Sequence, residues 1–236
     1  MIARMRLVLP EPVADVSLDA LYGGPRERLG GRPWVGLCMI TSLDGSTVVD
    51  GRSGALGNAT DTAVLGALRR AADLVIVGAA TVRLERYGPP RKAGQRIGVV
   101  TSTGDVDAAS ELFASGAGFL IMPEDGPPPP SGASRPLEVV RAGARRVDLA
   151  LALRRLDELM DPPTFVQAEG GPRLNGSLLE ADCVDELDLT LSPALVGGEG
   201  SRVIVGAQPK MERYELVHLG VDDESYAFGR WTRRRE

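Results

Sequence analysis

Two glycines separate an apolar run from a helical pattern at residues 169–172, Glu-Gly-Gly-Pro. Glycine has no side chain, so the backbone at this point can approach a ligand closely. The free N–H groups at the start of the following helix attract anions. This arrangement predicts a phosphate or pyrophosphate site, although a plain tight turn between a strand and a helix has the same sequence.

A second loop of small residues follows another apolar run, at residues 78–82, Gly-Ala-Ala-Thr-Val. It predicts either a tight turn or a second wall of a nucleotide cleft. Glu169 has no basic neighbour in the sequence, which is typical of a solvated loop charge or of an anchor for a substrate amide or ring nitrogen. Asp44 precedes Gly45 and is explained by turn chemistry.

The cysteine and histidine content excludes several kinds of site. The 236 residues contain two Cys, Cys38 and Cys183, and one His, His218. They form no CxxC or HExxH motif, so we expect no metal site. A Ser-His-Asp triad would depend on His218 alone, and no G-x-S-x-G motif accompanies it. Two isolated Cys in apolar stretches are typical of reduced thiols in a cytoplasmic protein.

The charge balance and the hydropathy pattern argue against nucleic acid and membranes as partners. The chain has 27 basic and 32 acidic residues, a net charge of −5, which gives no overall attraction to nucleic acid or to an anionic membrane. The longest apolar run, residues 74–82, has about half the length of a membrane span. Pro10 interrupts the N-terminal apolar run too early for a signal peptide. We therefore expect a cytoplasmic protein that acts on a small molecule.

Apolar runs and helical patterns alternate along the chain, and they predict the elements that position these loops. Strands buried on both faces are predicted at the continuous apolar runs 34–40, 74–77, 97–100 and 118–122. Shorter strands are predicted at 146–147, 164–167 and 186–191. Helices are predicted at 58–72, 148–160 and 172–181, with a weaker pattern at 107–114. A terminal hairpin is predicted from strands at 214–219 and 226–231.

Alternation of strands and helices predicts a three-layer α/β fold. Its central sheet is mostly parallel, and the hairpin adds antiparallel edge strands. Ligands of such sheets bind beyond the carboxyl ends of the strands. That rule selects the segments 41–45, 78–83, 101–104 and 168–171, which include both glycine-containing loops. We interpret residues 1–31 as an N-terminal arm and residues 32–236 as a single domain.

The order of these segments resembles the reductase domain of bacterial riboflavin biosynthesis, a pyrimidine reductase of the dihydrofolate-reductase-like superfamily. The similarity extends over about residues 32–230. Its most specific element is Glu-Gly-Gly-Pro-Arg-Leu-Asn-Gly-Ser-Leu-Leu at 169–179. It is accompanied by Ser-Leu-Asp-Gly at 42–45, Ser-Gly at 53–54 and Ala-Ala-Asp-Leu-Val-Ile-Val-Gly-Ala-Ala-Thr-Val at 71–82.

The resemblance implies NADPH-dependent reduction of 5-amino-6-(5-phosphoribosylamino)uracil, or of the pyrimidine that precedes its deamination, to the ribitylamino form. It also implies a homodimer. Residues 85–92 and the small residues near Ala55 depart from the family pattern on the substrate side. Two alternatives therefore stay open: a dihydrofolate-reductase-like enzyme acting on a pterin or folate, and a non-catalytic NADP-binding module. A dehydrogenase with G-x-G-x-x-G is disfavoured because no such run follows the first strand.

The resemblance also assigns roles to residues. Those implied to contact the cofactor are Gly170, Gly171, Pro172, Arg173, Leu174, Asn175, Thr81, Glu85 and Ser102. Those implied to contact the substrate are Glu169 at the pyrimidine, Arg69 and Arg91 at the ribose phosphate, and Ser53. The candidate donors for the 2′-phosphate of NADPH are Thr101, Ser102 and Arg83. No residue is assigned to acid–base catalysis, because hydride transfer to an open imine requires little of it.

Overall fold

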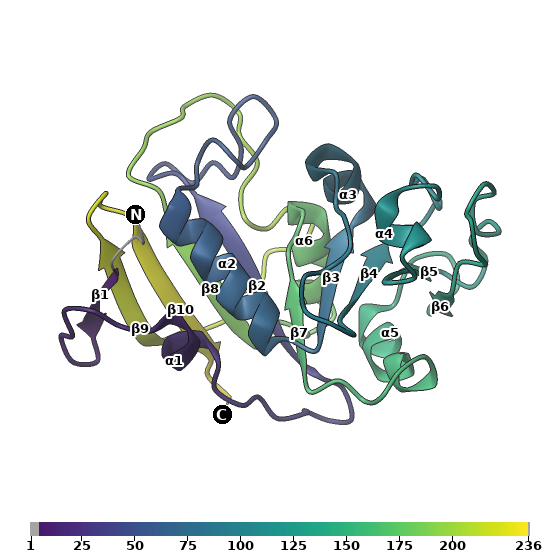
Figure 1. Ribbon diagram of the computed structural model, residues 1–236, viewed down its shortest axis with the longest axis horizontal. Coiled ribbons are helices and arrows are strands. Elements are labelled where there is room, and N and C mark those ends of the chain that lie inside the picture. Colours follow the sequence, from purple (N-terminus) through teal and green to yellow (C-terminus); the bar gives the residue numbers. More distant parts are fainter. Residues whose placement is uncertain (1–4, 236) are drawn as a thin grey trace.

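The continuous apolar runs form the middle of a ten-stranded sheet with the order β1-β9-β10-β8-β2-β7-β3-β4-β5-β6 (Figure 1). The computed structural model describes residues 5–235. The parallel strands are β2 (Trp34–Thr41), β3 (Leu74–Gly78), β4 (Arg96–Val100), β5 (Gly118–Met122), β6 (Val139–Arg141), β7 (Phe165–Ala168) and β8 (Glu186–Leu191). The antiparallel strands are β1 (Met5–Leu9), β9 (Tyr214–Asp222) and β10 (Ala227–Arg233). The predicted mostly parallel sheet with a C-terminal antiparallel hairpin is confirmed.

Helices cover both faces of this sheet, which gives the predicted three layers. One face carries α1 (Leu18–Tyr22), α2 (Ala59–Ala71), α3 (Ala79–Glu85) and α4 (Glu111–Ala114). The other face carries α5 (Leu149–Arg155), continued by a 3-10 turn (Leu156–Glu158), and α6 (Pro172–Glu180). Between residues 5 and 235, no helix combines the length and the apolar character that crossing a bilayer requires.

The centre of the core follows from the alternation of side chains along β3. Val75 and Val77 pack with α3 and α4, whereas Leu74 and Ile76 pack with α5 and α6. Successive strand residues point to opposite faces, and all four of these side chains are 0% exposed. A continuous apolar run is therefore the sequence that a strand between two helical layers needs.

The strand predicted at 146–147 is wrong, because this segment is a bend. The chain pairs with β5 earlier, through β6. It then turns at Gly143, which has φ +77°, and the side chain of Asp148 caps α5. Residues 146–147 lie between that turn and that cap, so they have no strand edge to pair with.

The N-terminal segment is joined to the sheet. β1 pairs antiparallel with β9, and Leu18, Leu21 and Tyr22 of α1 belong to the same apolar cluster as α2. The division of the chain at residue 31 stays a prediction.

The alternating strand β8 has an unexpected orientation. Glu186 and Asp188 are buried beneath α1 and α2, while Leu187, Leu189 and Leu191 are only half-buried. Arg26 donates to Glu186 at 2.7 Å and Arg230 at 2.9 Å. Burial opposes ionisation, but these two guanidinium groups hold the pKa of Glu186 below its usual value. The charges thus lie inside the protein because they are paired there.

The leucines of β8 therefore point away from α1 and α2. In the sheet register Leu189 is level with Gly229 and Leu219, and Leu191 is level with Ala227 and Val221. These side chains form what we call the apolar sheet face: Leu189, Leu191, Leu219, Val221 and Ala227.

Candidate functional site

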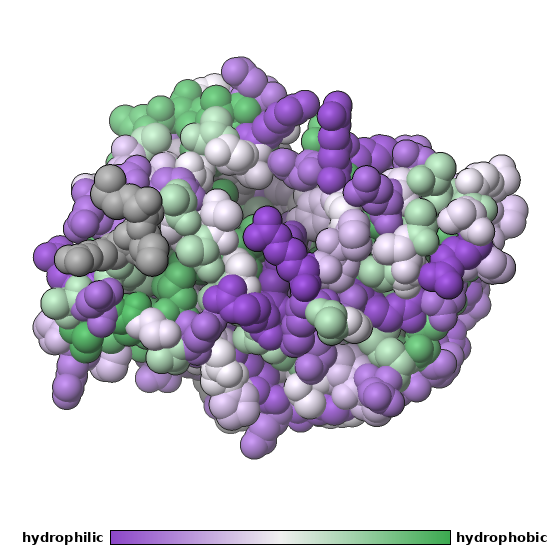
Figure 2. Space-filling view, viewed as in Figure 1, coloured by the Kyte–Doolittle hydropathy of each residue, from purple (hydrophilic) through white to green (hydrophobic). Residues whose placement is uncertain are grey.

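A cavity of 840 Å³ lies across the carboxyl ends of β2, β7, β3 and β4. Its wall includes the start of α6, most of α3, part of α2 and the loops that follow β2 and β8. In Figure 2 the surface is hollowed between the parts that carry α2 and α3, and hydrophilic residues surround the hollow. The volume falls within the ~300–1,000 Å³ typical of small-molecule sites. The cavity lies where the strand-end rule predicted a ligand.

The glycine loop forms the floor of this cavity next to β3. The N–H of Gly78 donates to the carbonyl of Gly170 at 2.8 Å, which ties the two predicted loops together. Gly171 precedes α6, has no capping side chain, and is followed by Pro172 in the first helical turn. Gly171, Pro172 and Arg173 line the cavity. Pro172 has no N–H, and the N–H groups of Leu174 and Asn175 donate to the carbonyl of Gly171. The N–H groups of Gly171 and Arg173 are therefore the ones left for an anion at the start of this nine-residue helix.

The loop predicted at 78–82 is mostly helical, because α3 begins at Ala79. Small residues bring this helix close to the glycine loop: a Cβ on Gly171 would lie 2.9 Å from Oγ1 of Thr81. Ala79, Ala80 and Thr81 line the cavity, so the segment is a wall of the cleft.

Glu169 is not a solvated loop charge, since it is only 8% exposed. Its carboxylate accepts from Nε and Nη2 of Arg69 at 2.7 and 2.6 Å, from the Tyr87 hydroxyl at 2.5 Å and from Nε2 of Gln167 at 3.0 Å. These four bonds fill the lone-pair sites of a carboxylate. The hydrogen bond to Glu169 raises the pKa of Arg69. Burial and the Glu169 charge raise the pKa of Tyr87.

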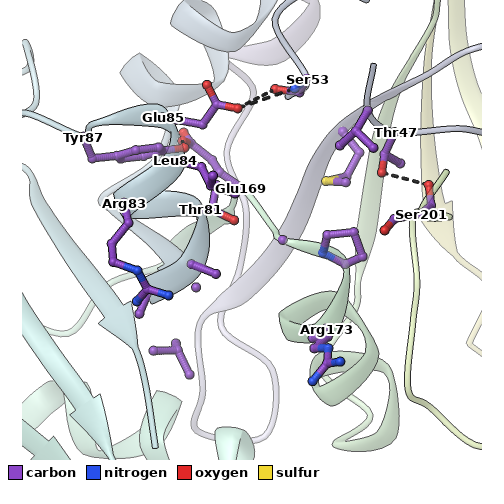
Figure 3. A pocket seen from close by; sticks show the side chains of 18 of the residues that line it. Thr47, Ser53, Thr81, Arg83, Leu84, Glu85, Tyr87, Glu169, Arg173 and Ser201 are labelled. Carbon is purple, nitrogen blue, oxygen red and sulfur yellow. Dashed lines mark hydrogen bonds between the residues drawn. The ribbon is translucent and has the colours of Figure 1, made fainter. Parts of the chain in front are cut away.

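Tyr87 was missed by the sequence analysis. It follows α3 and lies in the segment 85–92 that departs from the family pattern. Figure 3 shows its ring directed toward Glu169, and the Arg69 guanidinium lies 5.5 Å from the ring centre. The departure of segment 85–92 from the family pattern was the one feature of the sequence that could have pointed to Tyr87.

Arg91 lies outside the cavity and is exposed. The segment that contains it closes the end of α2 instead. Lys92 Nζ donates to the carbonyl of Ala72 at 2.7 Å, and Gln95 Nε2 donates to the same carbonyl at 2.8 Å. The structure therefore brings Arg69 to the site and leaves Arg91 away from it.

Two predicted residues meet across the mouth of the cavity. The Ser53 hydroxyl donates to Oε1 of Glu85 at 3.2 Å, as Figure 3 shows. Ser53 belongs to the loop after β2, and Glu85 is the last residue of α3. Both line the cavity, so the bond joins the side predicted for substrate to the side predicted for cofactor.

The end of β4 supplies Thr101 and Ser102 to the cavity wall, and α3 supplies Arg83. Thr101 Oγ1 accepts from the N–H of Gly104 at 3.0 Å, and Arg83 pairs with Asp105 at 3.1 Å. Ser102 is exposed.

Gly170, Leu174 and Asn175 do not line the cavity, although all three were assigned to the cofactor. Leu174 belongs to the core, and Nδ2 of Asn175 donates to the carbonyl of Val203 at 2.8 Å. These side chains fix α6 and the loop after β8, and thereby the position of Gly171.

Asp44 does more than form a turn. The N–H of Gly45 donates to the carbonyl of Ser42 at 3.0 Å, as turn chemistry predicts. The Asp44 carboxylate also accepts from the N–H of Gly197 at 2.7 Å. Hydrogen bonds from Ser42, Gly197 and Val196 lower the pKa of Asp44 to about 2. Asp44 thus joins the loops after β2 and β8 that border the cavity.

His218 lies far from this chemistry, within the sheet. It is 4% exposed, its ring meets Tyr22 edge-on at 5.0 Å, and burial lowers its pKa to about 4. In the described part of the chain, no three His, Cys, Asp or Glu side chains gather as metal ligands do.

Comparisons with known proteins identify the family of the chain. The RibD C-terminal domain family matches residues 33–228. A protein of Methanothermobacter thermautotrophicus named 2,5-diamino-6-ribosylamino-4(3H)-pyrimidinone 5′-phosphate reductase is 30% identical over 210 residues, which cover 84% of this chain and 94% of the relative.

Solved structures agree on the fold. A pyrimidine reductase-like protein from Corynebacterium diphtheriae has a TM-score of 0.77 at 24% identity, covering 94% of this chain and 100% of the other. Dihydrofolate reductase from Enterococcus faecalis has a TM-score of 0.51 at 15% identity, covering 86% and 97%.

The predicted family, fold and class of activity are thereby confirmed, and a reductase with this fold implies a nicotinamide cofactor. The chain belongs to the RibD C-terminal domain family and is a reductase of riboflavin biosynthesis with a dihydrofolate-reductase-like fold.

Proposed function

We propose that this chain uses NADPH to reduce a phosphorylated ribosylaminopyrimidine to its ribitylamino form. The observation that carries the proposal is the composition of the cavity. The open N-terminus of α6 lies on one part of its wall, and the pair of Arg69 with Glu169 lies beside another. The name of the Methanothermobacter relative favours the diaminopyrimidinone that precedes deamination. The alternative substrate is the product of that deamination, 5-amino-6-(5-phosphoribosylamino)uracil.

The cofactor fits the glycine side of the cavity. Its pyrophosphate would lie against Gly170 and Gly171, where the N–H groups of Gly171 and Arg173 would be its backbone donors and no side chain caps α6. Thr81 would contact it from α3, and Ser102 would contact the adenosine half from the end of β4. The Enterococcus relative, which was solved in complex with NADP(H), supports the choice of NADPH. The bound nicotinamide supplies the hydride.

The substrate fits the side formed by α2. Arg69 uses two of its five N–H groups on Glu169, which leaves donors for a phosphate. Glu169 has no free lone pair, so a pyrimidine N–H must replace one of its four partners. Tyr87 is the partner we expect to yield, because it follows α3 in a loop, whereas Gln167 is 1% exposed within β7.

Product analysis tests this proposal. The enzyme would be incubated with NADPH and each phosphorylated pyrimidine in turn, and the product would be examined by mass spectrometry. We expect a gain of two hydrogens on the sugar side chain. Reduction of dihydrofolate in place of both pyrimidines would favour the pterin alternative, and NADPH binding without any reduction would favour the non-catalytic module.

We also propose a homodimer that forms through the apolar sheet face. Leu189 and Leu219 lie level with Gly229 on this face, opposite the side that α1 and α2 cover. Contiguous apolar surface of this kind marks an interface, and a second copy can bury it with two-fold symmetry. Sedimentation velocity at micromolar concentration should show a dimer, and Leu189→Asp should convert it to a monomer. A monomeric wild-type protein would contradict this assignment.

A cytoplasmic location remains part of the proposal. The free thiols Cys38 and Cys183 support it.

A further inference from the structure

One face of α2 points into the cavity. Asp61, Leu65 and Arg69 are spaced four residues apart, so they lie on the same side of the helix. Asp61 and Leu65 line the cavity, and Arg69 binds Glu169 beside it. The first residue of this row, Asp61, is a carboxylic acid to which the proposed function assigns no role.

Asp61 lies at the end of the cavity away from the glycine loop. Its neighbour Thr190 belongs to β8, which flanks β2 on the side opposite β7. Gly57 leaves just enough space for the carboxyl, because a Cβ there would lie 2.7 Å from Oδ2 of Asp61. The side chain of Asn58 accepts from the N–H of Asp61 at 3.0 Å. The Asn58 cap therefore fixes the backbone of Asp61, while Gly57 and Thr190 border its carboxyl.

The surroundings of Asp61 shift the pKa of its carboxyl upward. Burial raises the pKa of Asp61, and interaction with the Thr190 hydroxyl opposes this rise. Among the described residues, no basic side chain contributes to the shift.

The ionisable groups near Asp61 come from several elements. β2 contributes Cys38, a thiol whose pKa is raised by burial and by the charges of Asp188, Asp61 and Glu169. β8 contributes Asp188, whose pKa is raised by burial. Beyond Asn58 lies Asp222, which accepts from Asn58 Nδ2 at 2.8 Å.

The other acidic side chains that line the cavity form hydrogen bonds or ion pairs with protein groups. Glu169 accepts four hydrogen bonds, including two from Arg69. Asp105 pairs with Arg83 on the exposed side of the cavity. Glu85 is exposed and accepts from Ser53. Asp61 is the cavity acid that is half-buried and free of such a basic partner in the described structure.

Reduction of an imine consumes a proton as well as a hydride. The hydride from the reduced nicotinamide forms the new C–H bond at the imine carbon. The carbon–nitrogen π bond breaks, its electron pair moves to nitrogen, and nitrogen takes up a proton. The nicotinamide is oxidised and the imine becomes a secondary amine, so the balance requires one proton donor for each turnover.

We propose that Asp61 is a catalytic residue that donates this proton to the imine nitrogen. The proposal rests on the proposed function. The Asp61 carboxyl gives up its proton as the N–H bond forms, and the resulting carboxylate takes a proton from water before the next turnover. The competing explanation is structural: an acid in the first turn stabilises a helix through its dipole. The two explanations differ in the pH dependence of kcat.

The substitution Asp61→Asn tests the proposal. It keeps the shape of the side chain and removes the acid, so kcat should fall by about 100-fold or more, as expected for loss of general acid catalysis. The Kd values for NADPH and for the ribitylamino product should stay within about twofold of wild type. In the wild type, kcat should fall as pH rises through the Asp61 pKa, and this limb should be missing from the variant. Unchanged kcat with an unchanged pH profile would overturn the proposal.

A pair of glycine substitutions tests the position of the Asp61 carboxyl without changing its charge. Gly57→Ala places a methyl group against the Asp61 carboxyl and should lower kcat with little effect on the Kd for NADPH. Gly66→Ala is the matched control on α2, because its Cβ would meet only the flexible Nη1 of Arg70, at 3.4 Å. Equal kcat for the two variants would contradict the positioning of Asp61.

Failure of the proposed function has a different signature. If wild-type protein reduces the pyrimidine and Asp61→Asn does so equally well, only the role of Asp61 is wrong. If wild-type protein binds NADPH but reduces neither pyrimidine, the proposed substrate is wrong. The Asp61 proposal, which assigns a proton to that reduction, then falls with it.

Discussion

Arg69 and Glu169 are 100 residues apart in the chain and form a two-bond ion pair beside the cavity. The pair joins α2 to the carboxyl end of β7 and fixes two of the four side chains that the sequence assigned to the substrate. Glu169 is almost fully buried in this pair, and the Arg69 side chain is 35% exposed.

Arg69→Ala should impair both substrate binding and stability. KM for the phosphorylated substrate should rise at least tenfold, while the Kd for NADPH stays nearly unchanged. The variant leaves Glu169 without its counter-charge, so the free energy of unfolding should drop by about 2–3 kcal/mol, below the value for a fully buried pair because Arg69 is partly solvated.

The neighbouring Arg70 provides a matched control. It pairs with Asp19 on the surface, where the side chains are 57% and 67% exposed. Arg70→Ala should cost about 0–1 kcal/mol and leave KM unchanged. Equal behaviour of the two variants, measured by denaturant unfolding and steady-state kinetics, would refute the role of Arg69.

Tyr87→Phe should lower KM for the pyrimidine. It removes the hydroxyl that occupies Oε2 of Glu169 and so frees one acceptor position for the substrate. The ring and its contact with Arg69 remain. A higher KM in steady-state kinetics would show instead that Tyr87 holds Glu169 in position.

Gly171→Val should weaken NADPH binding at least tenfold, about 1.4 kcal/mol. Its Cβ would lie 2.9 Å from Thr81 Oγ1, where the backbone must approach the pyrophosphate. Gly24→Val is the control, because a Cβ on Gly24 has no neighbour within 4 Å. Calorimetric titration with NADPH measures both. Normal binding by Gly171→Val would place the pyrophosphate elsewhere.

The free energy of unfolding should fall with pH between about 6.5 and 4 because of His218. Burial lowers the pKa of His218 to about 4 in the folded protein, whereas unfolded His titrates near 6.5. The unfolded state therefore binds the extra proton in this window, and stability decreases as pH falls, by up to about 3 kcal/mol.

His218 is the only histidine of the chain, so its NMR signal is unambiguous. Denaturant unfolding at pH 7 and at pH 4.5 measures the loss of stability, which His218→Gln should reduce. A titration midpoint near 6.5 in the folded protein would contradict the effect.

The strands and the glycine loop were predictable from the sequence because local rules govern them. β3 has to be apolar on both faces, and Gly171 lies at the turn between β7 and α6, beside the cavity. The pair of Arg69 with Glu169 required tertiary structure, since the two residues are 100 positions apart in the chain.

Three features escaped the sequence analysis for identifiable reasons. The alternation in β8 predicts a strand but not which face is buried, and here buried Arg26 reverses the usual choice. The helix α3 has too few residues to show a period. Tyr87 reaches Glu169 only because the chain turns at Arg86, with φ +51°, after α3.

The central claim is tested most directly by following NADPH oxidation at its absorbance band with the phosphorylated diaminopyrimidinone, and then with dihydrofolate under the same conditions. We predict that the wild-type protein turns over the pyrimidine, that Asp61→Asn loses most of this turnover, and that dihydrofolate supports little or no NADPH oxidation. Rapid reduction of dihydrofolate and none of the pyrimidine would contradict it.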